Sequence, residues 1–202
     1  MTAQPSRRRY RMVARAEKRD QTRRKIVQAM KDAIMTSAYP SIRIADVAGT
    51  AGVSSQTVHT HFASKEALFL AAIGELGQEL LEMRGGTPPG DVVAIARGLV
   101  AEYERYGDVN WALLPLERDS TAVAAALQAG RAGHRAWLEA SFAPLLPVHP
   151  RRRRQALDAL YAATDVGTWK LLRRDLGLSS ARTRAVIETL VRGALTACDD
   201  SH

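Results

Sequence analysis

Apolar side chains recur every three or four positions along most of this chain, which is the period of an amphipathic α-helix. The first such segment covers about residues 18–37, and Tyr39-Pro40-Ser41 ends it because the residue before a proline avoids helical geometry. Two short helical segments follow, at about 44–51 and 55–62. A fourth segment, about 20 residues long, begins after Ser64 and carries the most regular apolar stripe: Phe69, Ile73, Leu76, Leu80 and Met83.

A glycine- and proline-rich break at residues 85–90 separates this part from the rest of the chain. Only helical periods follow it. One helix starts near Val92, a short piece spans about 111–116, and a long alanine-rich helix spans about 121–142. After a proline-containing loop, a further helix ends near Gly177 and one last helix follows. With no alternating strand pattern and no internal repeat, the sequence predicts an all-α protein of about nine helices.

Residues 44–68 have the pattern of a helix-turn-helix, two short helices joined by a tight turn. Gly52 suits the left-handed backbone that such a turn needs, and Ser54 is a good N-cap for the second helix. The small residues Ala48 and Ala51 let the two helices approach closely. The apolar residues of the segment are expected to face inward: Val47, Val53, Val58 and Phe62.

The second helix of this motif carries polar side chains suited to reading DNA. A recognition helix contacts base edges in the major groove with its N-terminal residues. Here those residues are Ser55, Gln56 and Thr57, with Thr60 one turn later. Glutamine can bond adenine at two points, and the methyl group of threonine can contact that of thymine. These four residues are the predicted base contacts.

The motif resembles the N-terminal domain of the TetR family of bacterial transcription regulators. The resemblance runs from about Arg23 to Ile73, and residues 51–68 (AGVSSQTVHTHFASKEAL) carry most of it. It implies a homodimer that represses transcription at a palindromic operator, an inverted repeat in double-stranded DNA, until a small inducer binds. We expect three parts: a basic flexible arm at 1–17, a helix-turn-helix DNA-binding domain of three helices at 18–66, and a helical ligand-binding and dimerisation domain at 67–202.

Two positions depart from the family pattern. Arg43 stands where the family usually has a serine or threonine that caps a helix; arginine cannot cap but binds phosphate strongly, and Ser41 could instead cap a shifted helix start. His59 stands where the family often has tyrosine, and histidine can still donate to a phosphate. Lys65 matches the family's phosphate-binding lysine, at a helix N-terminus that favours anions. The predicted phosphate contacts are Arg43, Ser54, His59, His61, Lys65, Arg9 and Arg11.

The positive charge of the chain is concentrated at one end. The formal net charge is +8; residues 1–70 hold 13 basic and 5 acidic residues, and the remainder holds 16 of each. Such asymmetry indicates a polyanion-binding end, although a basic solvated tail gives the same count. The recognition helix has no lysine or arginine, so affinity must come from elsewhere, including Arg23, Arg24 and the arm. The arm arginines at 7–9 and 11 either enter a minor groove, as homeodomain arms do, or stay disordered on DNA.

The C-terminal part is electrically neutral and has no family signature. Ligand pockets are mostly apolar with a few placed polar groups. Its aromatic and isolated polar residues are therefore candidates to contact a small, mainly apolar ligand, although residues at helical spacing are more often plain core. The candidates are Phe69, Ile73, Tyr103, Trp111, His134, Trp137, Tyr161, Asp165 and Trp169. The last two helices resemble the family's dimer interface, a four-helix bundle, with these candidate residues: Leu160, Gly167, Val186, Leu190, Gly193 and Ala194.

Composition excludes several other classes of protein. Apolar residues make up 46% and charged residues 25%, the usual globular mix, and no uncharged run is apolar enough for a membrane span. The single cysteine, Cys198, allows no intrachain disulfide and no cysteine-based zinc site. Common catalytic motifs are absent, so we expect no enzyme, no metal and no cofactor. The prediction is a cytoplasmic bacterial regulator, nucleoid-associated when bound to DNA; the alternative is an architectural DNA-binding protein without ligand control.

Overall fold

The computed structural model describes the backbone of residues 5–197 and the side chains of residues 12–197. These residues form helices and turns without a strand, which confirms the all-α prediction. None of their helices is both long enough and apolar enough to cross a membrane. The chain divides into two compact units, Met1–Leu76 and Gly77–His202. The boundary falls inside helix α4 (Lys65–Arg84), so one continuous helix contributes to both units. Cys198 lies outside the described residues.

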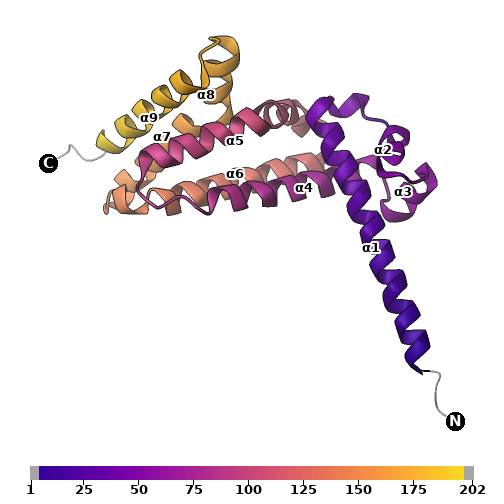
Figure 1. Cartoon of the computed structure of the whole chain (residues 1–202). Helices are drawn as coiled ribbons and strands as arrows, with labels where there is room; N and C mark the ends of the chain where they lie inside the picture. The colour runs from indigo at the N-terminus through magenta and orange to yellow at the C-terminus, as the bar shows by residue number, and fades with distance from the viewer. Residues whose placement is uncertain (1–4, 198–202) are drawn as a thin grey trace. The chain divides into compact units, whose positions relative to one another are not determined.

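The helices of the first unit (Figure 1) pack around a small apolar core. Ahead of α4 it contains these elements: α1 (Pro5–Thr36), the 3₁₀ turn η1 (Tyr39–Ser41), α2 (Ile44–Ala51) and α3 (Ser55–His61). Helix α2 packs against both α1 and α3. The rings of Tyr39 and Phe69 lie 4.2 Å apart between centroids, which seats η1 on α4. The other principal core residues are Ile26, Met30, Val47, Val58 and Leu68.

Helix α1 begins at Pro5, earlier than the start near residue 18 that the apolar period predicts, so residues 5–17 of the basic arm are helical. Residues 12–21 are all exposed, and the first buried side chain is Ile26. The apolar period therefore marks where the helix starts to pack and not where it begins. Arginine, lysine, alanine and glutamate favour helix without packing, and they dominate this segment. The first half of α1 is a free-standing extension (Figure 1).

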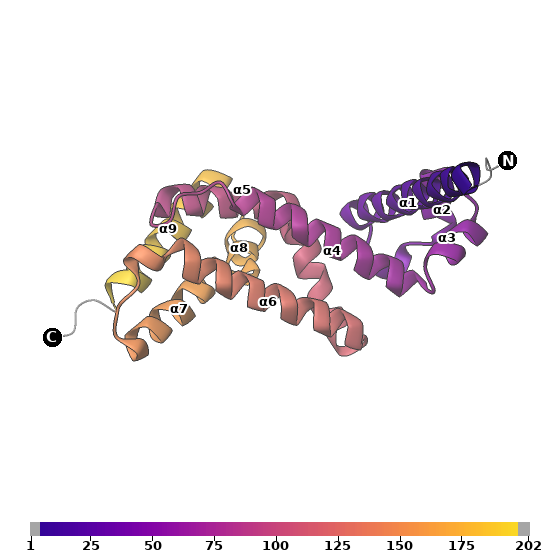
Figure 2. The same cartoon turned by 90° about the horizontal axis from the view of Figure 1, so that it is seen from below.

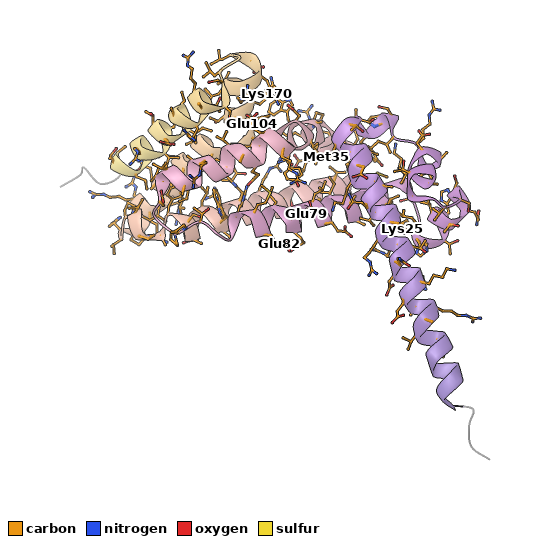
Figure 3. The ribbon with its side chains drawn as sticks, in the orientation of Figure 1. Lys25, Met35, Glu79, Glu82, Glu104 and Lys170 are labelled. Atoms are coloured by element: carbon orange, nitrogen blue, oxygen red, sulfur yellow. The ribbon has the colours of Figure 1, made fainter. Side chains whose placement is uncertain are left out.

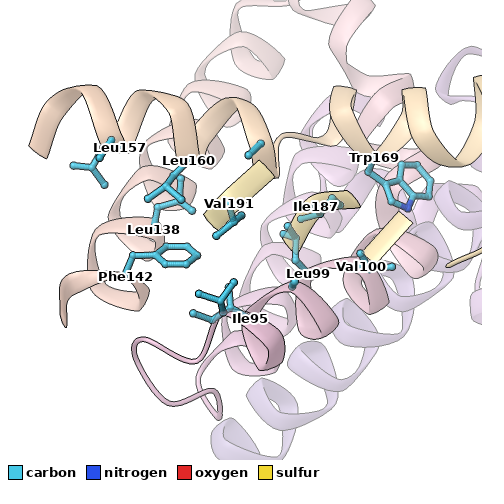
Figure 4. Close-up of a cluster of buried hydrophobic side chains, with 14 of the residues drawn as sticks. Ile95, Leu99, Val100, Leu138, Phe142, Leu157, Leu160, Trp169, Ile187 and Val191 are labelled. Atoms are coloured by element: carbon cyan, nitrogen blue, oxygen red, sulfur yellow. The ribbon is translucent and has the colours of Figure 1, made fainter. Parts of the chain in front are cut away.

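The second unit is a bundle in which α9 packs on α7 and α5, α5 on α8, and α6 on α7 (Figure 2). After α4 it contains these elements: α5 (Val92–Leu113), the 3₁₀ turn η2 (Leu114–Arg118), α6 (Thr121–Ser141), the 3₁₀ turn η3 (Ala143–Leu145), α7 (Pro150–Thr164), α8 (Val166–Lys170), the π-helical turn η4 (Leu171–Asp175) and α9 (Ser180–Thr196). Figure 4 shows its core, which includes Leu99, Leu138, Phe142, Leu160, Trp169 and Ile187.

The helix expected to end near Gly177 is interrupted at Asp165. The backbone of Asp165 is extended, with a ψ of 150°. Its carboxylate accepts a hydrogen bond from the Gly167 N–H at 2.7 Å, so it caps α8 as a new helix. The break turns the chain so that the side chain of Trp169 enters the core, where it is fully buried against Gly107. Asp165, predicted to contact a ligand, therefore has a structural role as a helix cap.

Candidate nucleic-acid interface

The turn of the helix-turn-helix forms as the sequence predicts. Gly52 has a φ of 67°, the left-handed conformation, and its N–H bonds to the carbonyls that end α2. The Val53 N–H then donates to the Ala48 carbonyl at 3.0 Å, which closes the turn. Val47 of α2 and Val58 of α3 are each 1% exposed, and the two helices pack against each other. A side chain at position 52 would be strained whatever the space around it.

Helix α3 presents a short row of exposed polar side chains. Ser55, Gln56 and Thr60 are exposed, and Thr57 is half-buried. The Ser54 hydroxyl accepts from the Thr57 N–H at 3.1 Å and lies 2.9 Å from the Thr57 hydroxyl, so this pair caps the helix. Thr60 donates to the Gln56 carbonyl within the helix at 2.9 Å. Ser55 and Gln56 are thus the predicted base contacts whose side chains are least engaged within the protein.

The start of α2 resolves the alternatives at Arg43 and Ser41. Helix α2 begins at Ile44 with Arg43 in the N-cap position, and no side chain bonds to the first helical N–H groups there. Ser41 instead donates to the Ala38 carbonyl at 3.0 Å, so it does not cap α2. Arg43 is exposed. The first N–H groups of α2 therefore have no side-chain cap, and the phosphate contact of Arg43 stays a prediction.

Lys65 is engaged within the protein, unlike Arg43. Its ammonium donates to the Tyr39 carbonyl at 2.7 Å and lies 4.4 Å from the centre of the Tyr39 ring. Burial lowers the pKa of Lys65. These contacts tie the first residue of α4 to η1 and so fix the loop that leads into α2. Its predicted phosphate contact stays a prediction, because the ammonium already has partners in the folded unit.

The last turn of α3 lies beside α1. His59 is exposed and His61 is half-buried. The Arg23 guanidinium of α1 lies 4.9 Å from the centre of the Phe62 ring, at the C-cap of α3. Arg23 is exposed, so a basic side chain borders the end of the recognition helix. The side chains of the other two predicted phosphate contacts, Arg9 and Arg11, lie outside the described residues.

Three of the predicted ligand contacts come together in the second unit. We call His134, Trp137 and Tyr161 the aromatic cluster; the His134 ring lies 5.4 Å from Trp137 and 5.2 Å from Tyr161 between centroids. His134 Nε2 lies 3.0 Å from the Thr164 hydroxyl, which itself donates to the Leu160 carbonyl at 2.7 Å. His134 is therefore the donor in the first of these bonds. Burial, with the charge of Arg84, lowers the pKa of His134 to about 3.

A buried ion pair beside this cluster was not foreseen from the sequence. Arg84 donates to the Glu102 carboxylate twice, through Nε and Nη2, each at 2.6 Å. Glu102 is 1% exposed, and the Arg84 guanidinium lies 4.4 Å from the centre of the Trp137 ring. Burial raises the pKa of Glu102 and the bonds from Arg84 oppose that shift. No helical period connects these two residues, so no sequence signal pairs them.

The remaining predicted ligand contacts are spread over several places. Phe69 and Ile73 belong to the first unit, where Phe69 is a core residue against Tyr39. Tyr103 is buried and donates to the Thr164 carbonyl at 2.8 Å, close to His134. Trp169 is a fully buried core residue, whereas Trp111 is 41% exposed with Lys170 above its ring. Figure 3 shows Lys170 and Glu104 among the side chains of this region.

The predicted dimer residues divide between core and surface. Leu160 is fully buried in the core of its own unit, so it is not available to a partner. Figure 4 shows Leu160 in the same buried cluster as Leu138. Gly167 lies in the first turn of α8, where its N–H donates to the capping Asp165 carboxylate. On α9, Leu190 is 45% exposed and Gly193 has open space where a Cβ would project. Val186 and Ala194 are half-buried against the core.

Within residues 5–197, no three histidine, cysteine or acidic side chains gather as a metal-binding set. Residues 26–72 match the family described as bacterial regulatory proteins, tetR family. A tetR-family transcriptional regulator from Streptomyces coelicolor has a similar fold, with a TM-score of 0.72 and 17% identity over 88% of this chain and 81% of that chain. A transcriptional regulator from Rhodococcus sp. Rha1 gives a TM-score of 0.67 and 18% identity over 89% and 99% of the two chains.

A comparison with curated protein sequences found no match. The family match covers the helix-turn-helix whose turn, cap and exposed row are described above, and the structural similarity extends over both units. The resemblance drawn from the motif is thereby confirmed: the chain has the fold and the N-terminal helix-turn-helix domain of a bacterial tetR-family transcriptional regulator.

Proposed function

We propose that this chain is a one-component repressor that binds an inverted-repeat operator as a homodimer and releases it when a small, mainly apolar molecule binds the second unit. The observation that carries the proposal is the row on α3. Ser55 and Gln56 are exposed at the start of a helix that Ser54 caps and that a left-handed Gly52 turn positions. Helix-turn-helix proteins read base edges with the same part of the second helix.

Dimerisation through α9 is supported by the two faces of that helix. Ile187 and Val191 face the core and are each 1% exposed. Next to this buried face is a shallow, mainly apolar hollow lined by Ala185, Val186, Thr189 and Leu190. A twofold interface uses the same patch on both subunits, so a self-complementary apolar face suits it. Such a dimer would place two α3 helices in successive major grooves, about 34–36 Å apart.

The aromatic cluster is the proposed place for ligand recognition. It combines the rings of His134, Trp137 and Tyr161 with a few polar groups, the composition typical of small-molecule sites. Glu102 and Arg84 adjoin it through the contact of Arg84 with Trp137. Because coupling between two sites is reciprocal, DNA must weaken ligand binding by the factor by which ligand weakens DNA binding.

The test is a pull-down of sheared DNA from the source organism on the purified protein at physiological salt, followed by sequencing. Enrichment of a few sites that share an inverted repeat supports the regulator. Uniform recovery that falls with added salt supports the architectural alternative, because phosphate contacts alone carry no sequence information. Gln56→Ala should abolish the enrichment. Gln128→Ala is the matched control, since Gln128 is also an exposed helical glutamine, on α6 of the second unit.

A further inference from the structure

Residues 5–25, the first two thirds of α1, carry a charge surplus as large as that of the whole chain. Residues 5–25 contain ten arginines and lysines and two acidic residues, a surplus of eight that equals the net charge of +8. Residues 12–21 are exposed throughout, and side chains project from this part of α1 without another element beside them (Figure 3). Residues 12–21 therefore have no packing role in the unit, so their charge must serve solubility or a partner.

The arginines of this segment fall into a regular row. Arg7, Arg11, Arg15, Arg19 and Arg23 are spaced four residues apart, and we call them the arginine row. Successive members are neighbours about 6 Å apart along the axis, and each is rotated by about 40° from the one before, so the row winds slowly around α1. Like charges at this spacing destabilise an isolated helix. The row is therefore unfavourable by itself and becomes favourable when an anionic surface neutralises it.

The row starts at the recognition helix. Arg23, its last member, lies on the Phe62 ring at the C-cap of α3. From there the row runs along α1 toward Pro5. Any duplex read by α3 would therefore have one end of the row beside it. This continuity favours DNA over a membrane as the partner. Helices that lie in membrane surfaces carry a face of large apolar residues, and residues 5–25 contain no leucine, isoleucine, phenylalanine or tryptophan.

Building on the proposed function, we infer that the arginine row binds phosphates of the DNA that flanks each half-site. Minor-groove insertion of an extended arm, one of the two alternatives considered from the sequence, requires a narrower backbone than this helix. A helix with side chains is about 10–12 Å wide, whereas the minor groove of B-DNA is about 6 Å wide. The row therefore lies along the phosphate backbone outside the base pairs that α3 reads. It adds affinity and salt dependence but no sequence preference.

The experiment compares the parent protein with Arg15→Gln/Arg19→Gln on two duplexes, both with the inverted repeat found by the pull-down. One duplex ends at the repeat, and the other continues for about one helical turn on each side. The slope of log K against log salt is negative, and each lost phosphate contact makes it less steep by about 0.9. On the long duplex, the loss of two contacts per protomer should make the slope less steep by roughly 3.6 for a dimer. On the short duplex the two proteins should have the same slope.

Two further variants separate charge from other effects. Arg15→Lys/Arg19→Lys should keep the parent slope, because the charge is retained. Arg151→Gln/Arg154→Gln is the matched control, since it removes two exposed arginines from α7 in the second unit. An equal slope for the parent and the Arg15→Gln/Arg19→Gln protein on the long duplex would overturn the inference. So would arginine-dependent binding to vesicles of anionic lipid with no change on DNA, which would assign the row to a membrane.

Failure of this inference differs from failure of the proposed function. A parent protein that prefers no inverted repeat defeats the repressor proposal, and the flanking-phosphate inference falls with it. A parent protein that binds an inverted repeat with a slope independent of Arg15 and Arg19 defeats the inference alone.

Discussion

Replacing Gly107 with alanine tests the packing between α5 and α8 in the second unit. A Cβ at position 107 would lie 2.5, 2.7 and 2.8 Å from three carbons of the Trp169 ring. Carbon atoms in contact are normally about 3.5–4.0 Å apart, so the ring would have to move by about 1 Å. It has little freedom to do so, because Trp169 is fully buried and its Nε1 donates to Glu104 at 3.3 Å.

Two opposing effects decide the sign of the change. Alanine in place of glycine favours a helix interior by about 1 kcal/mol, and overpacking a core costs about 1–3 kcal/mol and sometimes more. At Gly107 three ring carbons lie within 2.8 Å of the added Cβ, so we expect a cost near the upper end, about 3 kcal/mol, and a net loss of about 2 kcal/mol in the free energy of unfolding. Gly98 of the same helix is the matched control. Its Cβ would meet only the Thr87 hydroxyl at 3.9 Å, so Gly98→Ala should gain about 1 kcal/mol.

The assay is urea unfolding of the full chain, followed by far-UV circular dichroism at one fixed protein concentration. Concentration is fixed because the stability of a dimer depends on it. The midpoint of Gly107→Ala should fall and that of Gly98→Ala should rise, with unchanged dependence on urea. Equal or greater stability of Gly107→Ala relative to Gly98→Ala would refute the reasoning from the Trp169 contact.

Three further predictions concern the second unit. Leu190→Asp should give monomers by light scattering and lose operator binding while the helices persist by circular dichroism; a dimer of full affinity would contradict the α9 interface. The pKa of His134 is lowered to about 3 in the folded chain, against about 6.5 in the unfolded chain. Below pH 6.5 the unfolded state therefore binds more protons, and the free energy of unfolding decreases as the pH is lowered, by roughly 1.5 kcal/mol from pH 6.5 to pH 5. His134→Gln should remove that part of the pH dependence of unfolding, and an unchanged profile would count against it. Thr183 is fully buried with no partner for its hydroxyl among the described residues, so Thr183→Val should raise the thermal midpoint, by about 1 kcal/mol in stability; a lower midpoint would disprove an unsatisfied hydroxyl.

The sequence predicts the helix-turn-helix well because its determinants are local. Gly52 needs only its own backbone conformation, and Ser54 caps a helix three residues away. Apolar periodicity marks the part of a helix that packs on other elements. It does not predict the start of α1 at Pro5, because the first half of this helix is exposed. Arg43 and Ser41 could not be ranked from residue type alone, since the choice depended on where η1 ends.

The second unit was harder to predict because its determinants are distant in the chain. Arg84 of α4 and Glu102 of α5 form an ion pair between two helices, and the apolar pattern of neither helix predicts this partner. Leu160 and Leu190 are the same residue type at helical spacing, yet one is fully buried and the other is 45% exposed. The sequence shows that each helix has an apolar face, but only the packing of α5, α7 and α9 decides which leucines remain at the surface.

The free-standing half of α1 also has a kinetic consequence. About 16 residues of helix extend roughly 24 Å, which is about three screening lengths at physiological ionic strength. The charge at the end of the extension is therefore felt by DNA before the charge on the body of the unit. Electrostatic steering of this kind raises association rates and lets a protein slide and hop along a duplex. In the proposed repressor the extension would thus act first in the search for a site, before α3 reads any base.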